Sequence, residues 1–164
     1  MTQHLAFIGL GSNLEDPCRQ LQRAFVAIEK LPGTCLIAQS SLYSSAPLGY
    51  ANQSDFVNAV AKVSTMLGPR ELLQALLQIE QSHGRERTFR NAPRTLDLDI
   101  LLFGEVQLHE EGLTIPHPQM HLRAFVLKPL LEIAPSVIIP AVGSATRAME
   151  SCIDQSLERL VDYA

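Results

Sequence analysis

Two aspartates separated by one residue are the side chains in this sequence best suited to hold a metal ion. Asp97 and Asp99 lie in the apolar run 95–103, which predicts a strand. Alternate side chains of a strand point to the same face, so both carboxylates project together. Their Cα atoms would lie roughly 6.5 to 7 Å apart, close enough to contact one cation or to bridge two. The side chains expected to face the core are Leu96, Leu98 and Ile100.

Four arginines precede this strand, in a segment whose threonine, asparagine and proline favour a mobile loop. They are Arg85, Arg87, Arg90 and Arg94. Arginine binds triphosphate oxygens through forked hydrogen bonds, and Mg²⁺ bound to carboxylates is usually completed by substrate phosphates. Phosphoryl transfer depends on positioning and charge neutralisation. Together these residues predict an enzyme that transfers a phosphoryl-type group from ATP.

The aspartates and the arginines also have a simpler interpretation. The aspartates could instead pair with nearby arginines on a solvated sheet face, and the arginine segment could be ordinary surface.

Other motifs in the sequence are weaker. No phosphate-binding G-x-x-x-x-G-K-[ST] motif occurs. Gly9-Leu-Gly11 lacks the third glycine and the acidic partner of a dinucleotide site, so we expect these glycines to form a turn. His117 and His121 have zinc-ligand spacing for a helix, but the flanking prolines favour a loop, with His117 as a phosphate or ribose contact.

Apolar patterns and turn signals predict alternating strands and helices. We expect strands at 5–10, 56–63 and 95–103 and an extended segment at 35–43. Helices are expected from Asp16-Pro17, with Asp16 as cap, to Pro32-Gly33; from Gly68-Pro69 to Gly84; and from about Ala145. This β-α-β-β-α-β order predicts one α+β domain over 1–164, with helices on one face of a mainly antiparallel sheet.

Composition narrows the class of protein. With 164 residues and 46% hydrophobic residues, the chain can bury one core. Its apolar runs are far shorter than the about 20 residues of a membrane span, and its N-terminus does not resemble a signal peptide, so we expect a cytoplasmic protein. A net charge of −4 gives no reason to expect nucleic acid. Three cysteines without close spacing are expected to be buried packing residues: Cys18, Cys35 and Cys152.

The segment Pro93-Arg-Thr-Leu-Asp-Leu-Asp-Ile-Leu-Leu-Phe-Gly104 resembles the signature of the 6-hydroxymethyl-7,8-dihydropterin pyrophosphokinases. The resemblance covers nearly the whole chain, in order and spacing. It includes segments 8–14, 45–49, 55–58, 79–80, 84–85, 113–117 and 123–125. It implies a ferredoxin-like α+β fold and transfer of pyrophosphate from ATP to the hydroxymethyl group of the pterin, leaving AMP. Two Mg²⁺ ions are implied as cofactors, with ATP as co-substrate.

The resemblance also implies roles for individual residues. Asp97 and Asp99 would hold both ions, and Arg85 and Arg94 would stabilise the migrating charge. The implied ATP contacts are Glu80, Arg87, Arg90, Ile100, Thr114, His117 and Arg123. The implied pterin contacts are Ser45, Pro47, Leu48, Gly49, Phe56, Asn58 and Phe125.

Local chemistry agrees with the implied pterin site. Phe56 and Phe125 could enclose a flat heterocycle, and the amide of Asn58 offers a donor and an acceptor to its edge. Ordinary core packing of the two phenylalanines is the alternative. Some members of the family carry a tryptophan that closes over the pterin, where this chain has Asn91. Three further departures near the nucleotide are Gly112, Pro118 and His121.

Two other functions fit part of the pattern. A metal-dependent phosphodiesterase would also use paired carboxylates with arginines, but it would hydrolyse its substrate without a pterin. A non-catalytic ferredoxin-like module could bind a small ligand, although it would not need both aspartates and the arginines. We expect a monomer that binds small molecules and neither nucleic acid nor membrane.

Overall fold

The centre of the molecule is an antiparallel sheet. The computed structural model describes residues 2–13, 16–45, 56–83 and 96–160. Within them, a six-stranded sheet has the order β10-β3-β4-β1-β5, and β2 also pairs with β4. Its strands are β1 (His4–Ser12), β2 (Thr34–Gln39), β3 (Leu42–Ser45), β4 (Phe56–Thr65), β5 (Leu96–Phe103) and β10 (Glu158–Leu160). The four extended segments predicted from the sequence are confirmed, and the one at 35–43 is divided into β2 and β3.

The predicted turn at Gly9 and Gly11 is wrong. Both glycines lie inside β1, which continues to Ser12 and pairs with β4 on one side and β5 on the other. The short apolar run before Gly9 suggested an early end to the strand. Neighbouring strands on both sides supply hydrogen-bond partners to the backbone of this segment, which outweighs the low strand propensity of glycine.

Helices α1 (Pro17–Glu29) and α2 (Pro69–His83) pack on one face of the sheet. Their apolar side chains recur every three or four residues, so each helix buries one stripe. On α1 the buried residues are Cys18, Leu21, Ala24, Phe25 and Ile28. Pro17 occupies the first turn as predicted, but the Asp16 side chain makes no capping hydrogen bond, since its backbone is left-handed with φ 56°.

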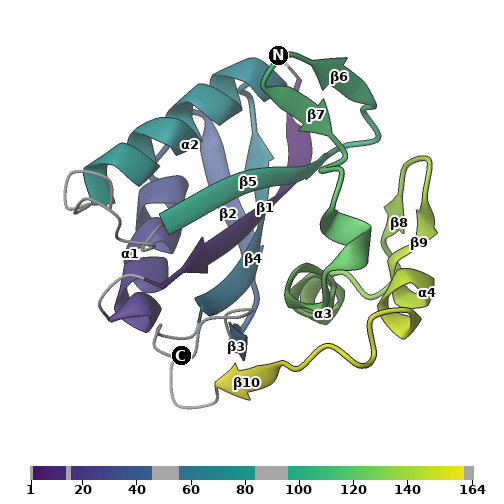
Figure 1. Cartoon of the computed structure of the whole chain (residues 1–164). Helices are drawn as coiled ribbons and strands as arrows, with labels where there is room; N and C mark the ends of the chain where they lie inside the picture. The colour runs from purple at the N-terminus through teal and green to yellow at the C-terminus, as the bar shows by residue number, and fades with distance from the viewer. Residues whose placement is uncertain (1, 14–15, 46–55, 84–95, 161–164) are drawn as a thin grey trace.

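Helix α3 (Ala124–Ile133) packs on the opposite face, so the expectation that helices lie on one face holds only for α1 and α2. Neighbouring residues of β1 point to opposite sides: Ile8 belongs to the cluster under α1 and α2, and Phe7 to the cluster under α3. Figure 1 shows α1 and α2 on one side of the sheet and α3 with α4 (Ala145–Glu150) on the other. The last helix predicted from about Ala145 is α4.

Short elements complete the described part of the chain. Two hairpins, β6 (Leu108–Glu110) with β7 (Leu113–Ile115) and β8 (Ile138–Ile139) with β9 (Gly143–Ser144), lie beside the main sheet. A 3₁₀ turn, η2 (Met120–Leu122), precedes α3.

The structure also bears on the burial of the three cysteines and on the character of the helices. Cys18 and Cys152 are buried as predicted, but Cys35 is exposed on β2, so that prediction is wrong for Cys35; all three are free thiols. None of the described helices is both long and apolar enough to cross a membrane.

Candidate active site

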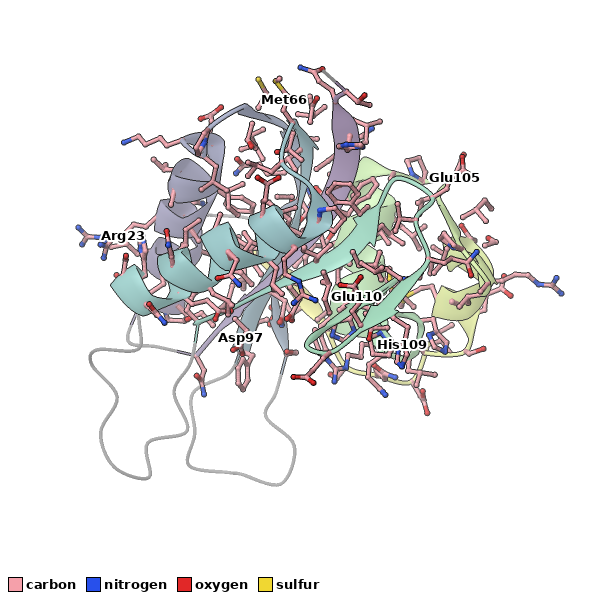
Figure 2. The ribbon with its side chains drawn as sticks, turned by 90° about the horizontal axis from the view of Figure 1, so that it is seen from above. Arg23, Met66, Asp97, Glu105, His109 and Glu110 are labelled. Atoms are coloured by element: carbon pink, nitrogen blue, oxygen red, sulfur yellow. The ribbon has the colours of Figure 1, made fainter. Side chains whose placement is uncertain are left out.

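The two aspartates of β5 project from one face of the strand, as predicted. Asp97 and Asp99 are exposed, whereas Leu96, Leu98 and Ile100 are at most 4% exposed and pack under α1 and α2. Figure 2 shows Asp97 at the opposite end of β5 from Glu105, which follows the strand. The alternation of buried and exposed residues from Leu96 to Ile100 therefore separates a core face from a carboxylate face.

The surroundings of Asp99 shift its pKa in both directions. Atoms packed around the carboxyl group desolvate it and raise the pKa of Asp99, although the residue as a whole stays exposed. The negative charge of Asp97 raises this pKa further, while His117 and Arg123 lower it. The negative pair of β5 thus has a histidine and an arginine close by.

His117 is fixed beside β5 by its backbone and its ring. The backbone N–H of His117 donates a hydrogen bond to the carbonyl oxygen of Leu101 at 3.0 Å. The N–H of Gln119 donates to His117 Nδ1 at 3.1 Å, which leaves the proton of a neutral ring on Nε2. Desolvation lowers the pKa of His117, with Asp99 acting against it and Arg123 reinforcing it. The proline-flanked loop predicted at His117 is confirmed, since η2 begins only at Met120.

Arg123 and Phe125 stand together at the start of α3. The guanidinium carbon of Arg123 lies 5.5 Å from the centre of the Phe125 ring. This distance permits a cation–π contact, which orients the guanidinium. Phe125 is half-buried and packs against the cluster under α3, so its ring combines core packing with a partly open surface.

Glu80, an expected ATP contact, is a buried residue of α2. It is 6% exposed, and its Oε2 accepts a hydrogen bond from the N–H of Leu98 at 2.7 Å. Leu98 lies between the two aspartates, so this bond fixes the outer edge of β5 where the carboxylates project. Ile100, another expected ATP contact, has its side chain in the core and only its backbone available to a ligand. The Oγ1 atom of Thr114, which is on β7, lies 3.2 Å from Nδ1 of His109.

Asn58 and Ser45, two expected pterin contacts, are joined by a hydrogen bond. Asn58 Nδ2 donates to Ser45 Oγ at 2.8 Å, and Asn58 is 4% exposed. Phe56 is half-buried and lies on the same face of β4 as Asn58. In the register of the sheet, Gly11 is directly opposite both Asn58 and Asp97. The amide and the carboxylate therefore project from the same face, with Gly11 between them.

The sequence analysis did not predict that Gly11 lies between Asn58 and Asp97. The available signal was the two-residue spacing of Gly9 and Gly11 within an apolar run, which in a strand puts both glycines on one face. Only the strand register shows which residues flank that face.

Seven expected contacts lie outside the described residues and stay predictions: Pro47, Leu48, Gly49, Arg85, Arg87, Arg90 and Arg94. Among the described residues, no three or more His, Cys, Asp or Glu side chains are grouped so as to hold a metal ion. A pair of carboxylates on one face still fits Mg²⁺, because this ion commonly binds one or two carboxylates and takes its other ligands from water and phosphate.

Comparison with known proteins decides the family. Residues 7–135 match the family described as 7,8-dihydro-6-hydroxymethylpterin-pyrophosphokinase (HPPK). The chain belongs to the HPPK family. It is 49% identical over 154 residues to the 2-amino-4-hydroxy-6-hydroxymethyldihydropteridine pyrophosphokinase of Pseudomonas aeruginosa, covering 94% of this chain and 95% of that protein. The protein of the same name from Haemophilus influenzae is 47% identical, with 94% and 97% covered.

The HPPK fold is also found in solved structures. A structure of HPPK-DHPS in complex with substrates matches with a TM-score of 0.76, covering 94% of this chain and 44% of that chain. The sequences are 15% identical, so this likeness bears on the fold alone. The predicted ferredoxin-like α+β fold, an antiparallel sheet with helices packed on it, is confirmed.

Proposed function

We propose that this protein transfers pyrophosphate from ATP to the hydroxymethyl group of 6-hydroxymethyl-7,8-dihydropterin, in folate biosynthesis. Membership of the HPPK family over most of the chain supports this activity. The observation that carries it in the structure is the row of Asn58, Gly11 and Asp97 across three strands, which puts an amide for a heterocycle next to a carboxylate for metal-bound phosphate. A phosphodiesterase is not favoured, because it needs no heterocycle site beside its carboxylates.

The products define which bonds change. The oxygen of the hydroxymethyl group attacks the β-phosphorus of ATP, and the bond between this phosphorus and the oxygen bridging to the α-phosphate breaks. AMP leaves with that oxygen, and the hydroxyl proton passes to solvent or to a nearby base. Catalysis then requires that the hydroxyl and the β-phosphate be held in line and that negative charge be neutralised.

Asp97 and Asp99 would hold Mg²⁺ with ATP phosphates as the remaining ligands. Bound there, Mg²⁺ supplies positive charge to the phosphate oxygens. Mg²⁺ as the metal and two as the number of ions are part of the proposal, drawn from the resemblance of the sequence. The ligands present suit this ion, because β5 carries two hard carboxylates two residues apart on an exposed face.

His117 and Arg123 would contact the nucleotide from the side of α3. A neutral His117 with its proton on Nε2 can donate a hydrogen bond to a phosphate or ribose oxygen, and Arg123 adds a positive charge. Thr114 would contribute a hydroxyl group from β7. Glu80 supports the site by holding Leu98, and its direct contact with ATP remains part of the proposal.

The pterin would lie between Asn58 and the aromatic rings of Phe56 and Phe125. Asn58 offers its carbonyl oxygen as an acceptor, while its Nδ2 already donates to Ser45 Oγ and retains one further hydrogen. Cytoplasmic location, a monomeric state and the absence of nucleic-acid or membrane partners belong to the same proposal.

Product analysis tests the proposed function. Purified protein is mixed with Mg²⁺, ATP and 6-hydroxymethyl-7,8-dihydropterin, and AMP and the pterin diphosphate are followed by chromatography. We expect AMP only when the pterin is present. Release of ADP, or of AMP without the pterin, would assign the site to another reaction. Pterin binding without any AMP would instead support the non-catalytic module.

A further inference from the structure

Arg123 occupies the break between two helical elements. It follows the 3₁₀ turn η2 and precedes Ala124, the first residue of α3, and its backbone is extended, with φ −125° and ψ 114°. Its carbonyl oxygen accepts hydrogen bonds from the N–H groups of Val126 and Leu127 at 3.1 and 3.0 Å, as expected of an N-cap residue. The side chain of Arg123 makes no capping hydrogen bond. The N–H of Ala124, which has no acceptor within the helix, therefore needs a partner from elsewhere.

The side chain of Gln155 supplies this partner from a distant part of the chain. Its Oε1 accepts a hydrogen bond from the N–H of Ala124 at 2.8 Å, and its Nε2 donates to the carbonyl oxygen of Leu122 at 2.9 Å. These two backbone groups belong to the two peptide planes that meet at the Cα atom of Arg123. The relative orientation of those planes is set by φ and ψ of Arg123. One planar amide bound to both planes therefore fixes the backbone conformation of Arg123.

A buried residue anchors the turn that carries Gln155. Figure 1 shows this part of the chain beside α3, between α4 and β10. Cys152 is 2% exposed and belongs to the cluster under α3, and its thiol lies 3.9 Å from the carbonyl oxygen of His121. The N–H of Gln155 donates to the carbonyl oxygen of Cys152 at 2.9 Å. Gln155 is exposed, but its backbone is tied to the core, which holds its amide at the start of α3.

We propose that Gln155 is a positioning residue for the nucleotide, which acts by fixing the backbone of Arg123. This inference rests on the proposed function, in which Arg123 contacts ATP. The guanidinium of Arg123 already lies over the ring of Phe125, with 5.5 Å between its carbon atom and the ring centre. With the backbone fixed as well, little conformational freedom remains to be lost when the guanidinium binds phosphate. Without Gln155 the backbone of Arg123 gains freedom, so binding of ATP carries a larger entropic cost.

The test variant is Gln155→Met, and the chain offers a matched control for it. Methionine keeps the length of the side chain but lacks the amide that binds the two peptide groups. At the start of α2, the exposed Glu71 accepts a hydrogen bond from the N–H of Gly68 at 2.8 Å. Glu71→Ala therefore also removes a bond between an exposed side chain and a backbone N–H at a helix start. No expected ATP or pterin contact lies at Glu71, so this control reproduces a loss of stability without affecting Arg123.

The decisive experiment compares both variants with the unaltered protein. The Kd of Mg²⁺–ATP is measured by calorimetry without the pterin, and KM for ATP and for the pterin are measured from initial rates of AMP formation. We expect Gln155→Met to raise Kd and KM for ATP about fivefold, part of the contribution of a hydrogen bond from a charged group. KM for the pterin should change less than about twofold, because neither bond of Gln155 reaches β3 or β4. Equal ATP constants for Gln155→Met and Glu71→Ala would overturn the proposal.

A double-mutant cycle with Arg123→Met tests whether Gln155 acts through Arg123. Gln155→Met should weaken binding of Mg²⁺–ATP when Arg123 is present and have no further effect when Arg123 is replaced. An equal effect in both backgrounds would overturn the proposal, because a general loss of structure would act in both. Failure of the unaltered protein to form AMP with the pterin would instead refute the proposed function. The calorimetric cycle does not depend on transfer to the pterin, so the two failures are distinguishable.

Gln155→Glu takes the place of Gln155→Met in the cycle if the methionine variant folds poorly. Its carboxylate still accepts from the N–H of Ala124, where a negative charge at a helix N-terminus is favourable, but it cannot donate to Leu122. The added charge repels ATP in both backgrounds, so the cycle cancels this effect. We expect Gln155→Glu to weaken binding of Mg²⁺–ATP more when Arg123 is present than when it is replaced. Equal weakening in the two backgrounds would overturn the proposal.

Discussion

Asp97 and Asp99 carry two negative charges on one face of β5, and their surroundings determine how strongly the two carboxylates repel each other. The pair repels itself, and desolvation adds to that repulsion at Asp99, while His117 and Arg123 reduce it. Neither aspartate supports the core, because the apolar residues of β5 point the other way. Residues of this kind serve ligand binding more than stability, since a protein gains little from adjacent carboxylates that it does not use.

Replacement of Asp97 by alanine should remove activity and leave the fold intact. The change deletes one of two charges that would hold metal-bound phosphate, so we expect kcat for AMP formation to fall about 10³-fold or more. The free energy of unfolding in urea should change by less than about 1 kcal/mol, because Asp97 is exposed. Glu105→Ala, at the other end of β5, is the control and should keep normal turnover. An unfolded Asp97→Ala protein, or one with near-normal turnover, would contradict this assignment.

At the scale of elements, one carboxylate joins three segments that are distant in the chain. Glu132 on α3 accepts hydrogen bonds from the Ser41 N–H at 3.0 and 3.1 Å, from Ser41 Oγ at 2.9 Å and from the Tyr43 hydroxyl at 2.6 Å. Arg159 of β10 lies 3.7 Å from it and also donates to Ser41 Oγ at 3.0 Å. This network fixes the start of β3, whose other end carries Ser45 to the hydrogen bond with Asn58.

The pH dependence of stability should report on Glu132. Burial alone would raise the pKa of Glu132, but hydrogen bonds from Tyr43 and Ser41, and the charge of Arg159, hold it below the ordinary 4.5. A folded pKa below the unfolded value contributes stability above about pH 4.5, and this contribution is lost as pH falls through the lowered pKa. Glu132→Gln should therefore destabilise the protein at pH 7 by about 1 to 2 kcal/mol, a range already reduced for partial exposure.

The measurement compares urea unfolding of Glu132→Gln and the unaltered protein between pH 3 and pH 7. The difference between the two proteins should shrink as pH falls below about 4.5, where the glutamate of the unfolded chain becomes protonated, and should be lost below the lowered pKa of native Glu132. Glu150→Gln, an exposed site on α4, is the matched control. A difference that stays constant over this pH range would show that the charge of Glu132 contributes nothing.

Elements with a repeated pattern were predictable from the sequence, and pairings between distant elements were not. The alternation along β5 predicted that Asp97 and Asp99 share a face, because each buried neighbour leaves a period-two signal. Glu158–Leu160 is too short to carry such a signal, so the addition of β10 beside β3 could not be foreseen. The network at Glu132 depends on that addition and on the position of α3.

Glycine carries a different ambiguity. A glycine satisfies either a demand for unusual backbone angles or a demand for space, and the sequence does not distinguish these demands. The turn predicted at Gly9 and Gly11 followed from the first demand, whereas their place in β1 fits the second. The row of Asn58, Gly11 and Asp97 is set by strand register, which is a property of the folded chain.

At the scale of the whole molecule, one sheet separates two apolar clusters. Alternate residues of the same strands contribute to each: Ile100 to the cluster under α1 and α2, and the adjacent Leu101 to the cluster under α3. Neither cluster can be exposed without disturbing the strands that support the other. The carboxylate face of the site lies on the α3 side, beyond the part of the sheet that this helix covers.

Unfolding should therefore occur as one transition even when either cluster is weakened. Leu76→Ala in α2 and Leu127→Ala in α3 each remove a fully buried side chain and should lower the free energy of unfolding by about 2 to 5 kcal/mol. Far-ultraviolet circular dichroism and tyrosine fluorescence should give the same urea midpoint in each variant, because Tyr43 is buried in the same sheet. The two losses should add in the double variant, since the side chains lie on opposite faces. Separate midpoints for the two probes would show that α3 and its cluster unfold independently of the sheet.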